Sequence, residues 1–363
     1  MALTDKDIMD ALKGVIDPNT NTDFVSGKCI RNLRVDGGAV RFDLEMSYPA
    51  HSQVPQFVEA LSQAARSLPG VAQVDITPRL NVIAHAVQRG VQLLPGVKNI
   101  VAVASGKGGV GKSTTAANLA LALASEGARV GLLDADIYGP SQPMMMGIEG
   151  KPTSEDGKTM EPLENYGVQV MSIGFLVAQD EAMIWRGPMA TQALEQLLRQ
   201  THWKDLDYLV VDMPPGTGDI QLTLSQRVPL TGAVVVTTPQ DIALLDARKG
   251  IKMFEKVGVP ILGIVENMAV HVCSQCGHAE HIFGVDGGRK MASEYGMDYL
   301  GALPLAMQIR VQADGGKPTV AADPDGDVAA IYKAVARKVA VAIAGKNKDF
   351  SSKFPTITIS KNT

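Results

Sequence analysis

A glycine-rich segment that follows an apolar run constrains this chain more than any other part of its sequence. The segment, "SGKGGVGKST" from Ser105, fits the pattern G-x-x-x-x-G-K-[S/T], and residues 99–105 have the apolar composition of a buried strand. An alanine- and leucine-rich run typical of a helix comes next. Glycines in a strand-to-helix loop let backbone N–H groups face phosphate oxygens, and the helix adds its positive N-terminal end. The sequence therefore predicts a phosphate-binding P-loop inside an α/β domain.

The side chains of this loop predict which groups of a nucleotide it contacts. Lys112 is expected to reach the β- and γ-phosphates, and the Ser113 hydroxyl is expected to coordinate Mg²⁺. No N-K-x-D or T-K-x-D guanine-reading motif occurs in the chain, so the sequence favours ATP over GTP. The loop residues expected to bind the nucleotide are Gly106, Lys107, Gly108, Gly109, Val110, Gly111, Lys112, Ser113 and Thr114.

Two further apolar runs end in aspartates. Asp212 closes "DYLVVD", at the place where P-loop proteins hold the Mg²⁺ shell. Asp134 and Asp136 follow the run "VGLL" in the same way. We expect at least one of these two to lie near the γ-phosphate and to orient water. A helix cap or a turn is the alternative for each aspartate taken singly.

Lys107 is a second lysine in the loop, which therefore reads K-G-G-x-G-K-S. An ordinary P-loop has no use for a lysine at this position. If two nucleotide sites face each other in a dimer, Lys107 can act on the partner's nucleotide, as an arginine finger supplied in trans does. A solvated loop lysine is the alternative.

The order of apolar runs predicts two folded units. Residues 1–78 have the pattern α-β-β-α-β of a small α/β domain, and residues 79–98 have the composition of a helical connector followed by a turn. Residues 99–345 alternate short apolar runs with helices, which predicts a doubly wound, mainly parallel sheet covered on both faces. Residues 346–363 are polar enough for a C-terminal tail. The runs expected as strands of the large sheet are residues 99–105, 129–136, 168–174, 207–214, 232–239 and 259–268.

Composition excludes several classes of protein. The formal net charge of −4 argues against a general nucleic-acid binder, which usually carries a basic balance. No apolar run reaches the roughly 18 residues of a membrane-spanning helix, and the first residues lack the basic and apolar regions of a secretory signal. Three cysteines do not form a secreted disulfide framework. We therefore expect a cytoplasmic protein that binds neither a membrane nor nucleic acid.

The segment "HVCSQCGH" places Cys273 and Cys276 just after the last apolar run. A zinc site could add His278 and His281, but its four ligands would crowd into nine residues. A redox pair would need the cysteines at the start of a helix, which the sequence does not indicate. An iron–sulfur cluster needs four thiolates, which two copies of the chain would supply. The residues alone leave these three possibilities open, whereas Cys29 is expected to be a small buried apolar side chain.

The motifs occur together in one known family. The chain carries "KGGVGKST", "DADIYGPS", "WRGPM", "DMPPGTGD", "ENM" and the C-x-x-C pair. This set resembles the Mrp/ApbC family of iron–sulfur cluster carrier ATPases, which belong with MinD and the nitrogenase iron protein among the dimer-forming P-loop ATPases. The resemblance covers nearly the whole chain, because residues 1–78 are similar to the small domain of metal–sulfur cluster assembly proteins.

The resemblance implies roles for single residues. Lys107 would be the signature lysine of these ATPases, Asp136 the switch I aspartate and Asp212 the switch II aspartate. Asn267 of "ENM" would contact adenine. Arg186 of "WRGPM" matches the family without an assigned role.

The resemblance also implies a function. We expect a slow ATP hydrolase that binds a [4Fe–4S] cluster on Cys273 and Cys276 at the interface of a homodimer and passes it to apoproteins, with hydrolysis controlling the dimer. The expected catalytic residues are Lys107, Lys112 and Asp136. The expected cofactors are ATP, Mg²⁺ and the cluster, and the expected partners are a scaffold or donor protein and apoprotein acceptors. The alternative is a MinD/ParA-type positioning switch whose C-x-x-C segment binds zinc.

Overall fold

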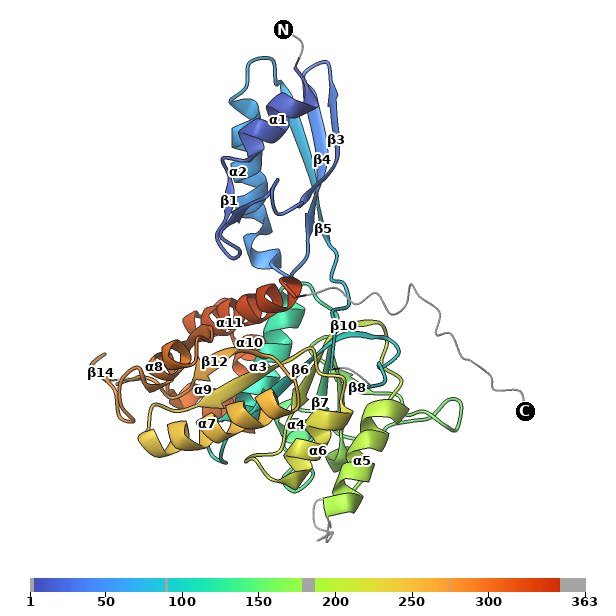
Figure 1. The fold of residues 1–363 in the computed structure, drawn as a ribbon, viewed down its shortest axis with the longest axis vertical. Helices are drawn as coiled ribbons and strands as arrows, with labels where there is room; N and C mark the ends of the chain where they lie inside the picture. The colour runs from blue at the N-terminus through green and yellow to red at the C-terminus, as the bar shows by residue number, and fades with distance from the viewer. Residues whose placement is uncertain (1–2, 89–90, 178–186, 274, 347–363) are drawn as a thin grey trace.

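The chain folds into a small N-terminal unit that stands on a larger α/β unit (Figure 1). The structure is a computed structural model that describes residues 3–88, 91–177, 187–273 and 275–346. The colour gradient of Figure 1 shows that the chain completes the small unit before it enters the larger one.

The larger unit is built on an eight-stranded sheet in the order β15-β12-β11-β6-β10-β7-β9-β8. Every neighbouring pair is parallel except β8 with β9 at one edge. The predicted doubly wound, mainly parallel sheet is therefore confirmed, and each of the six predicted runs holds one strand. The strands are β6 (Val97–Ala104), β7 (Val130–Asp134), β8 (Leu163–Asn165), β9 (Val168–Ser172), β10 (Leu206–Asp212), β11 (Gly232–Thr237), β12 (Ile261–Glu266) and β15 (Tyr299–Ala302).

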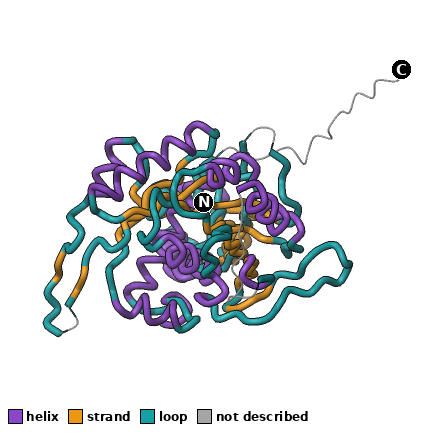
Figure 2. Tube along the Cα trace, turned by 90° about the horizontal axis from the view of Figure 1, so that it is seen from below, coloured by secondary structure: helices purple, strands orange, loops and turns teal. Residues whose placement is uncertain are grey.

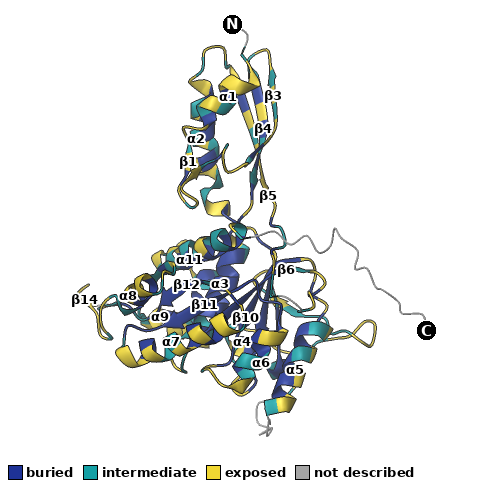
Figure 3. Cartoon of the chain, in the orientation of Figure 1, coloured by how far each residue is buried: buried dark blue, intermediate teal, exposed yellow. Residues whose placement is uncertain are grey.

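Helices cover both faces of this sheet, as right-handed crossovers between parallel strands require. On one face α3 packs against β6, β7 and β10, with α11 against α3, and on the other face α7 and α8 pack against β11 and β12. Because both faces are covered, every residue of β10 and β11 is buried (Figure 3). The helices are α3 (Lys112–Ser125), α4 (Gln142–Met145), α5 (Gly187–Gln200), α6 (Asp219–Arg227), α7 (Asp241–Lys256), α8 (Gly287–Glu294), α9 (Met307–Asp314), α10 (Thr319–Ala322) and α11 (Asp327–Ala344), with the 3-10 turn η2 (Ile173–Phe175).

The small unit has the predicted order α-β-β-α-β, with two short strands added. Strand β4 pairs antiparallel with β3 and parallel with β5. Alternate residues of β4 are buried, from Val40 to Met46, because one face of the sheet lies under the helices. The elements are α1 (Asp5–Leu12), β1 (Ile16–Asp17), β2 (Thr22–Asp23), β3 (Ile30–Asp36), β4 (Ala39–Met46), η1 (His51–Gln53), α2 (Val54–Arg66) and β5 (Gln73–Leu80).

The described residues of the connector between the units form no helix, so the prediction of a helical connector is wrong there. Strand β5 continues into it, and no helix occurs among the described residues of 79–98. Side chains hold this stretch against the larger unit instead: Asn99 Nδ2 donates to the Ile83 carbonyl at 2.9 Å, and Gln88 Nε2 donates to the Ser225 carbonyl at 2.8 Å. Long-range contacts of this kind outweigh a local helix propensity.

Several parts of the larger unit have no counterpart in the sequence prediction. The edge strands β8 and β15 are short, and β13 (His271–Val272) pairs with β14 (Ala279–Glu280) in a separate hairpin that projects from the body in Figure 2. Arg186 and residues 347–363 of the expected tail lie outside the described residues. Within the described part of the chain, no helix is both long and apolar enough to cross a membrane.

Candidate functional site

The glycine-rich loop joins β6 to α3 and accommodates only glycine at two positions. Gly111, the N-cap of α3, has a φ of +83°, a left-handed conformation that other residues rarely adopt. A Cβ on Gly106 would lie 2.1 Å from the carbonyl carbon of Asp246 in α7. The side-chain amide of Asn267, just beyond β12, donates to the Val110 carbonyl at 2.8 Å. The loop is therefore fixed from two sides, by α7 and by the end of β12.

Lys112 begins α3 and directs its ammonium into the protein. Only 6% of its side chain is exposed. The ammonium donates to Asp212 at the end of β10 and to the Ser113 hydroxyl at 3.0 Å. Its Nζ also lies 4.0 Å from Oδ2 of Asp136. The structure thus brings together four side chains that the sequence singled out.

Asp134 is fully buried at the end of β7 and fixes the loop that follows it. Its carboxylate accepts hydrogen bonds from the backbone N–H of Gln142 at 3.1 Å and from the Ser172 hydroxyl at 3.0 Å. Burial, together with the negative charge of Asp212, raises the pKa of Asp134 to about 7. Burial also raises the pKa of Asp136. One lysine therefore faces three carboxylates, and the site holds an excess of negative charge.

The donors around Lys112 suit a magnesium ion. Mg²⁺ prefers oxygen ligands, and Ser113 Oγ and the Asp212 carboxylate are oxygen donors on either side of the lysine ammonium. The excess of carboxylates also favours a divalent cation electrostatically. Ser113 and Asp212 are accordingly the residues that would hold the ion, while Asp136 lies within reach of the same ammonium.

Gln142 belongs to this cluster, although the sequence analysis missed it. Its Nε2 donates to Asp212 Oδ2 at 2.9 Å and to the Ser113 carbonyl at 3.1 Å. The residue is fully buried, and its Oε1 has no hydrogen-bond partner among the described residues. The one available signal was its place eight residues after Asp134, in the loop beyond the carboxyl end of a strand.

Lys107 lies apart from the carboxylates. It is half-buried, and its backbone carbonyl accepts a hydrogen bond from the Ser105 hydroxyl at 2.8 Å. The ion pairs of this loop are made by Lys112, and within the described residues Lys107 makes none. Gly108 and Gly109 beside it are exposed. This side of the loop therefore faces solvent rather than the buried cluster.

The cysteine pair lies in the turn of the β13–β14 hairpin. The Cys273 N–H donates to the His278 carbonyl at 2.9 Å, and Cys276 is exposed. Backbone N–H groups of Gln275 and Cys276 donate to the Cys273 sulfur and lower the pKa of its thiol. Cys29, ahead of β3, is half-buried, and burial raises its pKa to about 11. Cys273 therefore ionises far more readily than Cys29.

His271 and His281 contact backbone carbonyls, and His278 Nε2 lies 3.8 Å from Glu280 Oε1. His271 Nδ1 lies 3.0 Å from the Leu305 carbonyl, and His281 Nδ1 lies 2.8 Å from the Ala269 carbonyl. Among the residues that the structure describes, no three or more Cys, His, Asp or Glu side chains are grouped to hold a metal ion. The two histidines thus anchor the base of the hairpin.

Two known protein families match the two units of this chain. The family described as NUBPL iron-transfer P-loop NTPase matches residues 96–340, and the family described as iron-sulfur cluster assembly protein matches residues 5–76. The chain belongs to the NUBPL iron-transfer P-loop NTPase family.

Relatives and a solved structure agree with this assignment. The iron-sulfur cluster carrier protein of Pseudomonas fragi is 62% identical over 278 residues, which cover 76% of this chain and 97% of that protein. The iron-sulfur cluster carrier protein of Escherichia coli strain K12 is 52% identical over 324 residues, 89% of this chain and 88% of that protein. A nucleotide-binding protein from Archaeoglobus fulgidus, solved in complex with ADP, is 37% identical with a TM-score of 0.56 and covers 64% of this chain and 90% of that chain.

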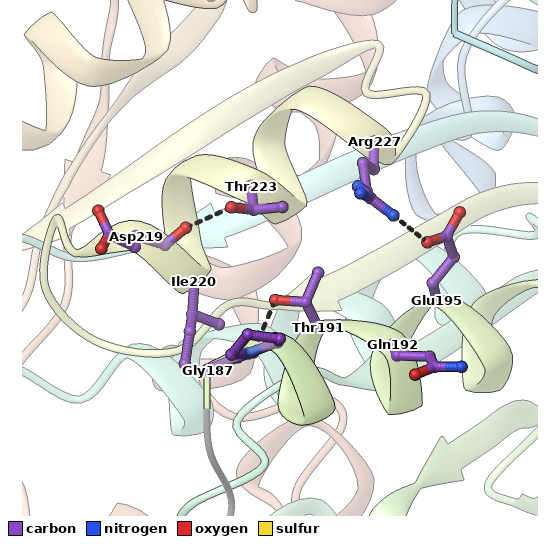
Figure 4. A pocket seen from close by; sticks show the side chains of 9 residues that line it. Gly187, Thr191, Gln192, Glu195, Asp219, Ile220, Thr223 and Arg227 are labelled. Carbon is purple, nitrogen blue, oxygen red and sulfur yellow. Dashed lines mark hydrogen bonds and ion pairs between the residues drawn. The ribbon is translucent and has the colours of Figure 1, made fainter.

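In this P-loop NTPase, helices α5 and α6 border a cavity of about 650 Å³. Figure 4 shows the Arg227–Glu195 ion pair, at 2.7 Å, which joins the two helices at one end of the cavity. A second cavity of about 400 Å³ shares Gly187, Asp219 and Ile220 with it and is also lined by Asp136. The two cavities therefore adjoin each other beside the Lys112 cluster.

Proposed function

We propose that this chain is an ATP-dependent iron–sulfur cluster carrier. The description of its family names iron transfer, and the relatives from P. fragi and E. coli are named iron-sulfur cluster carrier proteins. The observation that carries the proposal is the cysteine pair on a projecting hairpin. This hairpin comes soon after Asn267 in the chain, and the Asn267 side chain contacts the P-loop. A short piece of backbone therefore joins the nucleotide loop, where Asn267 also contacts adenine, to the two thiols.

Two copies of the chain hold one [4Fe–4S] cluster between their hairpins. Such a cluster takes four thiolates, Cys273 and Cys276 supply two, and a two-fold axis beside the hairpin doubles them. The exposure of Cys276 and the lowered pKa of Cys273 suit a site that forms between surfaces. Among the described residues of one chain, no third Cys, His, Asp or Glu is grouped with the two cysteines. This supports a site shared between two copies over a zinc site within one copy. A cluster at a subunit seam can also leave, as a cargo must.

ATP hydrolysis changes the state of the dimer and so controls the cargo. Lys112 binds the β- and γ-phosphates, and Ser113 and Asp212 would hold Mg²⁺, which neutralises phosphate charge when bound. Asp136 orients the attacking water. Lys107, which has no ion pair within the described part of its own chain, supplies its charge to the nucleotide of the partner copy.

The small unit serves the exchange of cargo with other proteins. We divide the chain into a small domain at residues 1–78, a connector at 79–98, the ATPase domain at 99–345 and a tail at 346–363. The match of residues 5–76 to an iron-sulfur cluster assembly protein family supports a docking role for the first part. Its partners are a scaffold or donor that supplies the cluster and apoproteins that accept it, in the cytoplasm.

A transfer assay tests this function. Protein reconstituted anaerobically with iron and sulfide is mixed with an apoprotein that needs a [4Fe–4S] cluster, and the activity of the acceptor is followed with and without Mg-ATP. We expect transfer by the wild type and none by Cys273→Ala or Cys276→Ala. The matched controls Cys29→Ala and His278→Ala should transfer as the wild type does. Loss of bound metal in His278→Ala would support the zinc alternative instead.

A further inference from the structure

Gln221, in the first turn of α6, has a buried side chain that no other described residue engages. Only 2% of the residue is exposed, and neither Nε2 nor Oε1 has a hydrogen-bond partner in the described structure. Its backbone carbonyl accepts a hydrogen bond from the Ser225 hydroxyl at 2.7 Å, so the helix uses the backbone of Gln221 and not its amide. A buried amide without partners destabilises a fold, and an apolar side chain of the same shape would not. A bound molecule that hydrogen-bonds to this amide would remove that cost.

Gln221 lines the second cavity, of about 400 Å³, beside the start of α6. Asp136 lines the same cavity and lies 4.0 Å from the Lys112 ammonium. Two prolines and a glycine of the loop after β10 form much of the remaining wall. Ile220, the neighbour of Gln221, lines both this cavity and the cavity of about 650 Å³ shown in Figure 4. Gln221 therefore shares a cavity with Asp136, which lies beside Lys112.

The polar groups of this cavity match the needs of one water molecule. The ionised Asp136 carboxylate only accepts hydrogen bonds, whereas the Gln221 amide has an acceptor oxygen and a donor nitrogen. A water that donates one hydrogen to Asp136 and the other to Gln221 Oε1 keeps a lone pair free for a third direction. We propose that Gln221 is a further catalytic residue, which holds the attacking water of ATP hydrolysis together with Asp136. This inference rests on the proposed ATPase function.

In this step the water oxygen forms a bond to the γ-phosphorus. The bond between the γ-phosphorus and the β,γ-bridging oxygen breaks, and its electron pair remains on ADP. The proton that the water loses passes to Asp136 and then to the inorganic phosphate. Gln221 exchanges no proton, because its contribution is the orientation of the water.

The variant Gln221→Met tests this role, because methionine has a similar shape and no hydrogen-bonding amide. We expect the turnover of Mg-ATP at saturation to fall about 10- to 100-fold, the range for losing one orienting contact in a transition state. The dissociation constant for ATP should stay within about twofold, and the melting temperature should be unchanged or higher since the unpaired amide is gone. The matched control Gln226→Met, exposed on the same helix, should leave all three unchanged.

A second variant, Gln221→Glu, keeps an acceptor for the water and should retain more turnover than Gln221→Met. Equal turnover in Gln221→Met and the wild type would overturn the inference. So would a lower melting temperature with a matching loss of ATP affinity, because these are the marks of a structural residue. A wild type that hydrolyses no ATP would contradict the proposed function itself, whereas an active wild type beside an equally active Gln221→Met contradicts this inference alone.

Discussion

The two ends of helix α3 both bury charge, but they balance it differently. At the first residue, the Lys112 ammonium contacts Asp212 and lies 4.0 Å from Asp136, with the buried Asp134 behind them. At the other end, the Glu126 carboxylate is fully buried and, within the described residues, pairs with one cation, Arg337, at 2.6 Å.

The second end joins the two units of the molecule. Ser52 of the small unit donates to Glu126 through its N–H at 2.9 Å and through its hydroxyl at 2.6 Å, and Arg337 belongs to α11. Both carboxylate oxygens of Glu126 therefore have partners. The two ends therefore show two kinds of buried charge. An excess of charge of one sign beside amides without hydrogen-bond partners indicates a site that a ligand completes. Buried charges that are balanced by opposite charges indicate a structural joint between elements.

Replacing Lys112 tests the ligand-binding end and has the largest expected effect. Lys112→Ala should lower ATP turnover by about 10³-fold or more, because the ammonium stabilises charge on the transferring phosphoryl group. Iron uptake should persist, since the cysteines lie on a separate hairpin. Phosphate release and iron content measure the two outcomes, and Glu126→Gln is the control at the other end, with turnover near that of the wild type. Failure of Lys112→Ala to take up iron would show that the sites are not separable.

Lys107 tests the proposal that the ligand-binding end receives charge from a second copy of the chain. Lys107→Ala should lower turnover about 100-fold with little change in ATP affinity. Mixing Lys107→Ala with Lys112→Ala should restore part of the turnover, since one mixed site then has Lys112 from one chain and Lys107 from the other. A mixture as inactive as its components, or an equal loss of affinity and turnover in Lys107→Ala, would indicate an ordinary role within one chain.

Glu126 tests the joint. Glu126→Gln leaves the Arg337 guanidinium, 13% exposed, without its counter-charge. The free energy of unfolding should fall by about 3 kcal/mol, as for other buried pairs that lose one partner. Glu294→Gln is the matched control, because its ion pair with Arg248 at 2.9 Å is exposed and should contribute about 1 kcal/mol or less. Urea denaturation compares the two variants, and equal losses would contradict the account of the joint.

Asp134 tests the ligand-binding end through the pH dependence of stability. Its folded-state pKa of about 7 lies above the value of about 3.9 in an unfolded chain, so the folded chain binds a proton that the unfolded chain releases. Stability of the nucleotide-free protein should therefore be greatest at acidic pH and fall as the pH rises between these two values. Asp134→Asn removes this titration. The melting temperature of the wild type should decrease relative to the variant across that range, and parallel curves would contradict the prediction.

Much of the fold could be predicted from the sequence because the signals are local. Strands buried on both faces appear as continuous apolar runs, such as "GAVVVT" of β11. The P-loop is a contiguous motif, and Asp134 and Asp212 are the last residues of β7 and β10. The prediction for the connector was wrong because the contact that holds it, from Gln88 to Ser225, joins residues 137 positions apart in the chain.

The rest of the candidate site could not be predicted, since burial of a polar residue depends on what packs over it. Gln221 carries no pattern that separates it from an exposed glutamine such as Gln226, and Gln142 offers only its place eight residues after Asp134. The joint brings together Ser52 and Glu126 from 74 residues apart, and Glu126 and Arg337 from 211 residues apart. No periodicity or spacing encodes such pairs.

In the proposed carrier, two copies of the chain share one cluster through their hairpins. Native mass spectrometry of anaerobically reconstituted protein tests it most directly. We predict a dimer that carries about four irons and about four sulfides, and no bound cluster in Cys276→Ala. Monomers that each carry their own metal ion, or a cluster retained in Cys276→Ala, would contradict the account.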